Sequence, residues 1–217
     1  MLLLRPPGVY PAQGDTALLA ESLAREGPLR GARCLDLGTG TGALALAAAD
    51  RGARVTAVDV SWLALATAGV NAWLHRHRIR LRHGDLTGPV RGRRFDLVLS
   101  NPPYVPAERA GSPRRGIARA WDAGPDGRLL LDRICREAPG LLARDGVLLL
   151  VQSSLADVPE TLRALGRSGL SAEVVARRRQ VFGPVMTGRA AWFESRGLID
   201  PGDREEELVV IRGAWPA

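Results

Sequence analysis

The hydrophobic pattern of the chain alternates between short β-rich runs and longer runs with helical periodicity. Seven short runs are predicted to be strands: Ala32–Leu37, Arg54–Val60, Ile79–His83, Phe95–Ser100, Gly146–Gln152, Ala172–Arg177 and Glu207–Arg212. Five longer runs are predicted to be helices: Asp15–Glu26, Gly42–Arg51, Ser61–Arg76, Gly127–Ala143 and Ala156–Ser168. Strands separated by helices of about ten residues or more are typical of βαβ units. We therefore expect an α/β domain with a mostly parallel, seven-stranded sheet and helices on both faces.

Two regions fall outside this alternation. Residues 103–126 form a long connection rich in Pro, Gly and Arg, and residues 177–206 form another before the last strand. Long connections in a compact domain are often lids or binding loops. We expect a single domain over residues 1–217, in which residues 177–206 are an extended loop or lid with a short helix around residues 188–196.

Composition places the chain among soluble globular proteins, with 46% hydrophobic and 24% charged residues. No apolar run approaches the roughly 20 residues of a membrane span, so we expect a cytoplasmic protein without membrane contact. The net charge is +7, and every one of the 30 basic residues is arginine. An arginine-only composition is also typical of a GC-rich genome, so the charge favours an anionic partner only slightly.

The cysteines and histidines predict no metal centre. Cys34 and Cys135 lie in separate apolar stretches, and His75, His77 and His83 have no ligand spacing with them. We expect two buried free thiols and no bound metal.

A glycine-rich turn follows the first predicted strand in the sequence Asp36-Leu-Gly38-Thr-Gly40-Thr-Gly42. Alternate glycines let the backbone turn sharply and approach a ligand closely, and the next helix offers its N-terminal N–H groups. The spacing G-x-G-x-G differs from the dinucleotide pattern G-x-G-x-x-G. Asp59, at the end of the second strand, can accept both ribose hydroxyls of a nucleoside.

A third carboxylate, Asp85, follows the third strand, where it would face an adenine amino group. Asp36, Asp59 and Asp85 at three successive strand ends are similar to the S-adenosyl-L-methionine pocket of class I methyltransferases. The alternative is that each carboxylate caps the helix that follows it.

The sequence Ser100-Asn101-Pro102-Pro103-Tyr104 ends the fourth strand, at the same edge of the sheet. The Asn101 side chain and the Pro102 carbonyl offer two acceptors for the hydrogens of a planar –NH2 group, and Tyr104 offers a stacking face. Such a nitrogen is a poor nucleophile, so its methylation depends on positioning and on polarisation by carbonyls. The alternative is a proline-stiffened turn with a buried tyrosine.

Together these motifs resemble the HemK/PrmC group of N5-glutamine methyltransferases. The sequences GIARAW (residues 116–121) and GPDGR (residues 124–128) narrow the resemblance to the short, single-domain branch of eukaryotic and archaeal type. The segment VYPAQGDT (residues 9–16) resembles that branch's VYEPAEDT. In this chain, Gln13 and Gly14 stand where the family has acidic residues.

The resemblance implies a class I fold, S-adenosyl-L-methionine as cofactor and S-adenosyl-L-homocysteine as product. It implies that residues 1–30 cover the cofactor, and that the catalytic residues are Asn101, Pro102, Pro103 and Tyr104. The cofactor-binding residues that it implies are Tyr10, Asp15, Thr16, Asp36, Gly38, Gly40, Gly42, Asp59, Val60, Asp85, Leu86 and Asn101. The family's substrate is the glutamine of a Gly-Gly-Gln loop on a release factor, and some members need a small zinc-binding activator subunit.

Three acceptors stay open on the residues alone: a glutamine amide of a release factor or another protein, N6 of adenine in DNA or RNA, or a small-molecule amine or amide. Arginines of segments 109–119 and 177–189 would serve the second by following phosphates. Against it, the chain offers no target-recognition domain for a flipped base. The block from Gly116 to Arg133 favours glutamine.

Overall fold

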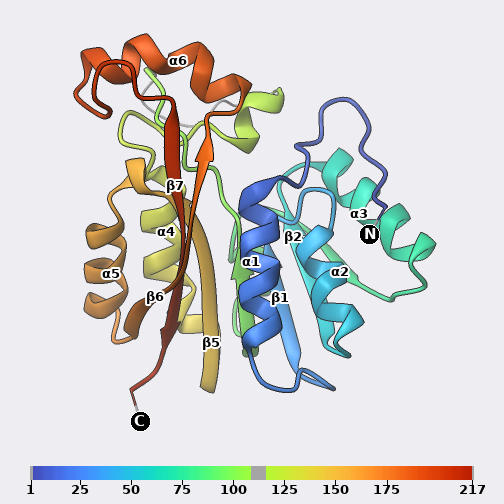
Figure 1. Ribbon diagram of the computed structural model, residues 1–217. Coiled ribbons are helices and arrows are strands. Elements are labelled where there is room, and N and C mark those ends of the chain that lie inside the picture. The colour runs from blue at the N-terminus through green and yellow to red at the C-terminus, as the bar shows by residue number, and fades with distance from the viewer. Residues whose placement is uncertain (1, 109–115, 217) are drawn as a thin grey trace.

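The computed structural model describes residues 2–108 and 116–216 and contains a seven-stranded sheet in the order β3-β2-β1-β4-β5-β7-β6 (Figure 1). The strands are β1 (Arg33–Leu37), β2 (Arg54–Asp59), β3 (Arg80–His83), β4 (Phe95–Ser100), β5 (Leu142–Ser153), β6 (Ser171–Val181) and β7 (Glu205–Ala214). Strands β1 to β5 pair in parallel, and β7 is antiparallel to both β5 and β6. The expected sheet is confirmed.

Helices cover both faces of this sheet (Figure 1). They are α1 (Gly14–Arg25), α2 (Ala43–Asp50), α3 (Trp62–Leu74), α4 (Leu129–Glu137), α5 (Val158–Arg167) and α6 (Pro184–Ser195). The central strands β4 and β5 are buried on both sides, and Val98, Leu99 and the run Leu148–Val151 are fully inaccessible. This explains their continuous apolar sequence. None of the helices in the described part of the chain is long and apolar enough to cross a membrane.

The expected extended loop over residues 177–206 is wrong, although the helix expected around residues 188–196 is present as α6. Residues up to Val181 continue β6, which pairs with β7, and α6 follows almost at once. The end of β6 is rich in arginine and lacks the apolar alternation of a strand. Arg177 forms an ion pair with Glu207, and Arg178 forms one with Glu21. Helix α6 has a proline at its N-terminus and lies over the carboxyl edge of the parallel strands (Figure 1).

The helix expected over Gly127–Ala143 is also shorter than its pattern suggests. Helix α4 ends at Glu137, and Pro139 begins a 3₁₀ turn, because proline cannot continue the α-helical ladder. Strand β5 then starts at Leu142, four residues before the expected start at Gly146.

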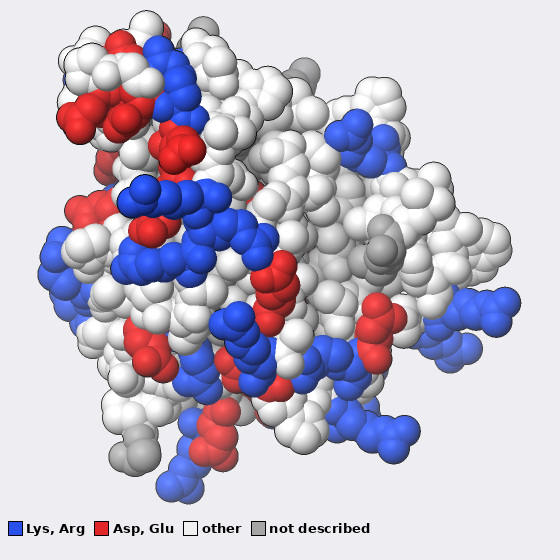
Figure 2. All heavy atoms as spheres, viewed as in Figure 1, with Lys and Arg blue, Asp and Glu red and all other residues white. Residues whose placement is uncertain are grey.

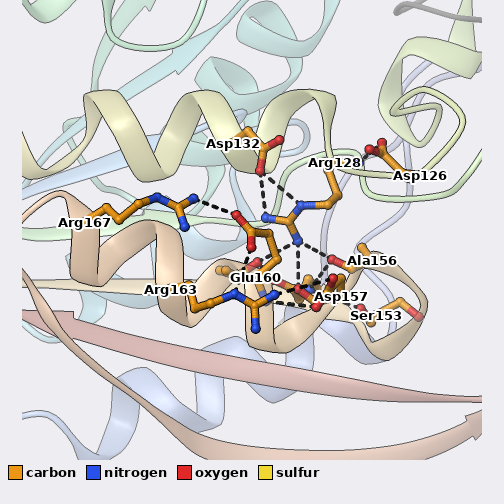
Figure 3. Close-up of polar contacts among 11 residues, drawn as sticks. Asp126, Arg128, Asp132, Ser153, Ala156, Asp157, Glu160, Arg163 and Arg167 are labelled. Atoms are coloured by element: carbon orange, nitrogen blue, oxygen red, sulfur yellow. Dashed lines mark hydrogen bonds and ion pairs between the residues drawn. The ribbon is translucent and has the colours of Figure 1, made fainter.

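The start of α4 is fixed by a buried guanidinium (Figure 3). Arg128 is 5% exposed. It donates to Oδ1 of Asp132 at 2.7 and 3.1 Å, to the carbonyls of Ala156 and Asp157, and to Oγ1 of Thr161. One side chain therefore ties the first turn of α4 to the turn that begins α5.

We expect Arg128→Ala to lower the free energy of unfolding by about 2–4 kcal/mol, because it leaves buried carbonyls without donors. Urea denaturation followed by circular dichroism measures this. Arg136→Ala on the same helix is the control, since that side chain is 67% exposed, and it should change the free energy by less than about 0.5 kcal/mol. Equal effects of the two variants would contradict the stabilising role of Arg128.

Candidate active site

A cavity of about 860 Å³ lies at the carboxyl edge of the parallel strands. Its wall comes from the N-terminal segment, the Gly-rich turn after β1, the end of β2, the start of α3, the loop after β3, the end of β4 and the 3₁₀ turn Ile117–Ala120. These segments are far apart in the sequence. They meet because parallel strands all end at one edge, where open α/β sheets bind their ligands.

Nine of the twelve residues that the sequence assigns to the cofactor lie in this wall: Tyr10, Thr16, Gly38, Gly40, Asp59, Val60, Asp85, Leu86 and Asn101. Asp15 lines a smaller adjoining hollow, whereas Asp36 and Gly42 line neither. All four residues assigned to catalysis line the hollow, and Asn101 and Pro103 line both spaces. The two predicted sites are therefore continuous.

The Gly-rich turn has the left-handed backbone that glycine permits. The φ angles of Gly38, Gly40 and Gly42 are +75°, +54° and +84°. At Gly42 a Cβ atom would lie 3.0 Å from the Cβ of Ala68 on α3, so packing also requires a glycine there. Oδ2 of Asp59 accepts the N–H of Gly40 at 3.0 Å, which fixes the turn against the end of β2.

Helix capping, the alternative for the three strand-end carboxylates, describes only Asp36. This side chain accepts a backbone N–H from the first turn of α2. The N-cap of α3 is Ser61 rather than Asp59. Asp85 forms a two-pronged ion pair with Arg133 at 2.9 and 3.1 Å. Asp59 and Asp85 therefore reach the cavity without capping the next helix.

Asp36 has an acceptor atom with no partner among the described residues. Its side chain is fully buried, and Oδ2 accepts from Oγ1 of Thr39 at 2.6 Å and from the N–H of Ala45 at 3.1 Å. Oδ1 is buried without a hydrogen bond, and burial raises the pKa of the carboxyl to about 7. Because the side chain lines neither space, its hydrogen bonds hold the Gly-rich turn against the start of α2.

Two arginines of the cavity wall were missed by reasoning from the sequence. Arg133 pairs with Asp85, and Arg119 lies close enough to Asp59 for its charge to lower the pKa that burial raises. Both belong to the segment that carries the family resemblance, and its spacing alone does not place them at a strand edge. Opposite charges thus face the two acidic residues of the wall.

The Asn-Pro-Pro-Tyr segment is bonded to the start of α1. Nδ2 of Asn101 donates to Oγ1 of Thr16 at 3.0 Å, so its Oδ1 is the acceptor turned the other way. The Tyr104 hydroxyl donates to Oδ2 of Asp15 at 3.0 Å, and Oγ1 of Thr16 donates to the other oxygen of Asp15 at 3.3 Å. One buried carboxylate therefore orients both polar side chains of the segment.

The adjoining hollow has a volume of about 30 Å³ and is lined in part by aromatic rings. Tyr10 and Trp121 lie there with ring centroids 5.9 Å apart. Trp121 was not singled out from the sequence, because its position depends on long-range pairing. The Tyr104 ring is also in this wall, and burial raises the pKa of its hydroxyl. Its stacking on an acceptor stays a prediction.

A buried amide holds the N-terminal segment over the cavity. Nδ2 of Asn71, on α3, donates to the carbonyls of Leu4 and Thr41, and its Oδ1 accepts the N–H of Leu4. Residues from Gly8 to Ala12 then form one side of the cavity wall. Among the described residues, no group of three His, Cys, Asp or Glu side chains is arranged to hold a metal ion.

Five parallel strands extended by an antiparallel hairpin, with a Gly-rich turn after β1 and acidic strand ends around one cavity, define the fold of class I S-adenosylmethionine-dependent methyltransferases.

Comparison with known proteins agrees with this class. Residues 2–114 match the methyltransferase small domain family. A relative from Methanocaldococcus jannaschii, named "Putative protein N5-glutamine methyltransferase MJ0928", is 35% identical over 83% of this chain and 90% of its own length. The ribosomal protein uL3 glutamine methyltransferase of Bradyrhizobium diazoefficiens is 44% identical over 54% of this chain and 39% of its own. The chain belongs to the methyltransferase small domain family and is a methyltransferase.

A solved structure has the same fold. It is the E. cuniculi Mtq2–Trm112 complex, described as responsible for methylation of the eRF1 translation termination factor. The TM-score is 0.69 at 24% identity, over 96% of this chain and 99% of that chain.

The raised pKa of Asp36 predicts how stability depends on pH. An unfolded aspartate titrates near pH 4, so between pH 4 and about 7 the folded protein holds a proton that the unfolded chain has lost. The free energy of unfolding should therefore fall as the pH rises through this range. The free energy of unfolding of Asp36→Asn, measured by urea denaturation at pH 5.5 and at pH 8, should rise by about 1–2 kcal/mol relative to that of the wild type between the two pH values.

Asp145→Asn, which changes an exposed carboxylate, is the matched control and should show no such gain. A constant difference between wild type and Asp36→Asn at the two pH values would mean that the buried carboxyl is already ionised at pH 5.5.

Proposed function

We propose that the chain is an S-adenosyl-L-methionine-dependent N-methyltransferase that acts on the side-chain amide of a protein glutamine. The observation that carries this is the orientation of Asn101, whose Nδ2 is bonded to Thr16 and whose Oδ1 remains an acceptor beside the cavity. The relatives from M. jannaschii and B. diazoefficiens, both named for glutamine methyltransferase activity, support the choice of acceptor.

The cofactor fits the cavity by its chemistry. Asp59 offers a carboxylate to ribose hydroxyls, Asp85 offers one to the adenine amine, and Gly38 and Gly40 let the backbone approach the ligand closely. When bound, the cofactor supplies a methyl group activated by its sulfonium. The N-terminal segment forms one wall of this space.

The hollow beside the cavity receives the acceptor amide. Oδ1 of Asn101 and the carbonyl of Pro102 accept the two hydrogens of its –NH2 group, which directs the nitrogen toward the cavity. Both carbonyl dipoles favour the positive charge that develops on the nitrogen as the methyl group is transferred. The proton is then lost to solvent, so the site needs no strong base.

The second candidate, methylation of adenine in nucleic acid, has less support. Figure 2 shows acidic side chains between the arginines of the viewed face. Arg177, Arg178 and Arg189, from the segment expected to follow phosphates, are each paired with a carboxylate. Arg109, Arg114 and Arg115 lie outside the described residues. The proposed acceptor is therefore a protein of the translation apparatus, such as a release factor.

A small partner subunit belongs to the same proposal, supported by the Mtq2–Trm112 complex. Helix α3 contains no charged residue, and its two polar side chains, Thr67 and Asn71, are buried. Its exposed residues are apolar: Trp62 (70%), Leu63 (45%), Val70 (45%), Trp73 (75%) and Leu74 (49%). An uncharged, aromatic surface of this kind suits a protein partner, and we assign it to a Trm112-type subunit.

Asn101→Ala should reduce kcat at least 100-fold, because the amide acceptor loses one of its two positioning carbonyls. The affinity for S-adenosyl-L-homocysteine, measured by calorimetry, should stay within about threefold of the wild type. Methyl transfer to a purified release factor is followed by mass spectrometry of its Gly-Gly-Gln peptide. A wild-type enzyme that labels DNA or RNA but no protein would reject the proposed acceptor. Loss of cofactor binding in Asn101→Ala would instead show that Asn101 acts mainly in the cofactor cavity, which it also lines.

Trp73→Glu should abolish association with a purified Trm112-type subunit, measured by size-exclusion chromatography with light scattering, because a charge would be buried in an apolar interface. Val181→Glu is the matched control: its side chain is 71% exposed, on β6 at the other end of the sheet. The control and the wild type should form the complex. No complex with the wild type, or equal binding by Trp73→Glu, would refute this surface.

A further inference from the structure

Helix α6 is a fixed part of the domain and lies at the same edge of the sheet as the cavity (Figure 1). Met186, Ala190 and Phe193 occupy positions i, i+4 and i+7 of the helix and are all buried. Phe193 is fully inaccessible and packs edge-on against Phe182, with ring centroids 6.3 Å apart. Because α6 is anchored by these buried residues, the backbone positions of the residues on its other faces are fixed.

One such side chain is Arg189, which reaches across to the segment that follows the Asn-Pro-Pro-Tyr sequence. One guanidinium nitrogen donates to the carbonyl of Pro106 at 3.0 Å, and another donates to Oδ1 of Asp122 at 2.5 Å. The side chains of Arg189 and Asp122 are 26% and 13% exposed. A planar guanidinium suits two acceptors held at a fixed separation better than the single ammonium of lysine does.

The two acceptors of Arg189 belong to segments that pair with each other. The N–H of Val105 donates to the carbonyl of Trp121 at 2.8 Å, and the N–H of Ala123 donates back to the carbonyl of Val105 at 3.0 Å. The N–H of Ala107 donates to the carbonyl of Gly124 at 2.9 Å. We call these paired segments, residues 104–107 and 121–124, the acceptor ribbon.

The acceptor ribbon forms one side of the hollow in which the acceptor amide is placed. Tyr104, Val105 and Trp121 all line it, together with Asn101. Arg189 lines neither the hollow nor the larger cavity. Its hydrogen bonds place Arg189 to act on the hollow through the ribbon.

We propose that Arg189 is a positioning residue, which holds the acceptor ribbon so that Tyr104 and Trp121 keep the width and direction of the acceptor hollow. This rests on the proposed function for the identity of the acceptor, a glutamine-bearing loop. The affinity for the cofactor should depend on Arg189 less, because most residues assigned to the cofactor lie at the ends of β1, β2 and β3, outside the ribbon.

Kinetics of Arg189→Ala test this. Its KM for the acceptor protein should rise at least tenfold, while the Kd of S-adenosyl-L-homocysteine stays within about twofold. Arg189→Lys should recover part of the loss, because an ammonium can satisfy one acceptor strongly. Arg204→Ala is the matched control: Arg204 pairs with Glu194 of α6 and has no bond to the ribbon. It should leave both constants unchanged.

Hydrogen exchange supplies a readout that needs no acceptor. In Arg189→Ala, the amides of Val105, Ala107 and Ala123 should exchange at least tenfold faster, and those of β4 should exchange as in the wild type. Unchanged exchange in the ribbon overturns the proposal, as does a weakened cofactor affinity with an unchanged acceptor KM. If the wild type methylates no glutamine, the proposed function fails, whereas the exchange experiment still decides the role of Arg189.

Discussion

The candidate site depends on one buried carboxylate at the start of α1. Asp15 is 4% exposed and accepts hydrogen bonds from Tyr104 and Thr16, and Thr16 in turn receives the amide of Asn101. These contacts join residues almost 90 positions apart in the sequence. A side-chain amide can present either its oxygen or its nitrogen to a ligand, and the bond to Thr16 selects the oxygen. The N-terminal segment thus determines the chemical character of a motif on β4.

Much of the fold was predictable because its determinants are local. Strand β4 and the helical runs α2 and α3 follow from hydrophobic period, and the Gly-rich turn follows from three glycines that all have positive φ. The failures differ in cause: α4 ends before Pro139, which is visible in the sequence, whereas the end of β6 has distant partners. The arginines of β6 are compatible with a strand only because Glu21 and Glu207, far away in the sequence, neutralise two of them. No local pattern contains that information.

The candidate site was predictable to the same extent. The strand-end carboxylates and the Asn-Pro-Pro-Tyr segment could be predicted because each directly follows an apolar run in the sequence. Arg119 and Trp121 reach the cavity or its hollow from a long connection, and no periodicity predicts where such a segment lies. Arg133 reaches the cavity from α4, and the helical period alone does not show which neighbour it contacts. The direction of the Asn101 amide was likewise invisible, because it depends on a hydroxyl from another element.

Several arginines of the chain have structural roles. Arg128, Arg133 and Arg189 connect helices, strand ends and loops through several acceptors each. A guanidinium with five N–H groups can satisfy carbonyls and carboxylates together. These arginines serve the fold rather than a bound polyanion, so arginine content and a pI near 10.9 are weak evidence for binding nucleic acid.

Asn71 gives helix α3 a double attachment. On the buried side of the helix, Asn71 is hydrogen-bonded to the N-terminal segment that forms a wall of the cavity. The outer side of the helix is the apolar surface assigned to a partner. The thirteen residues of α3 therefore carry both the contact to the cavity wall and the proposed partner surface. Thermodynamic linkage makes any coupling between them reciprocal: a partner that tightens the cavity is itself bound more tightly when the cavity is filled. The proposed partner subunit and the cofactor would then each raise the affinity of the protein for the other by the same factor.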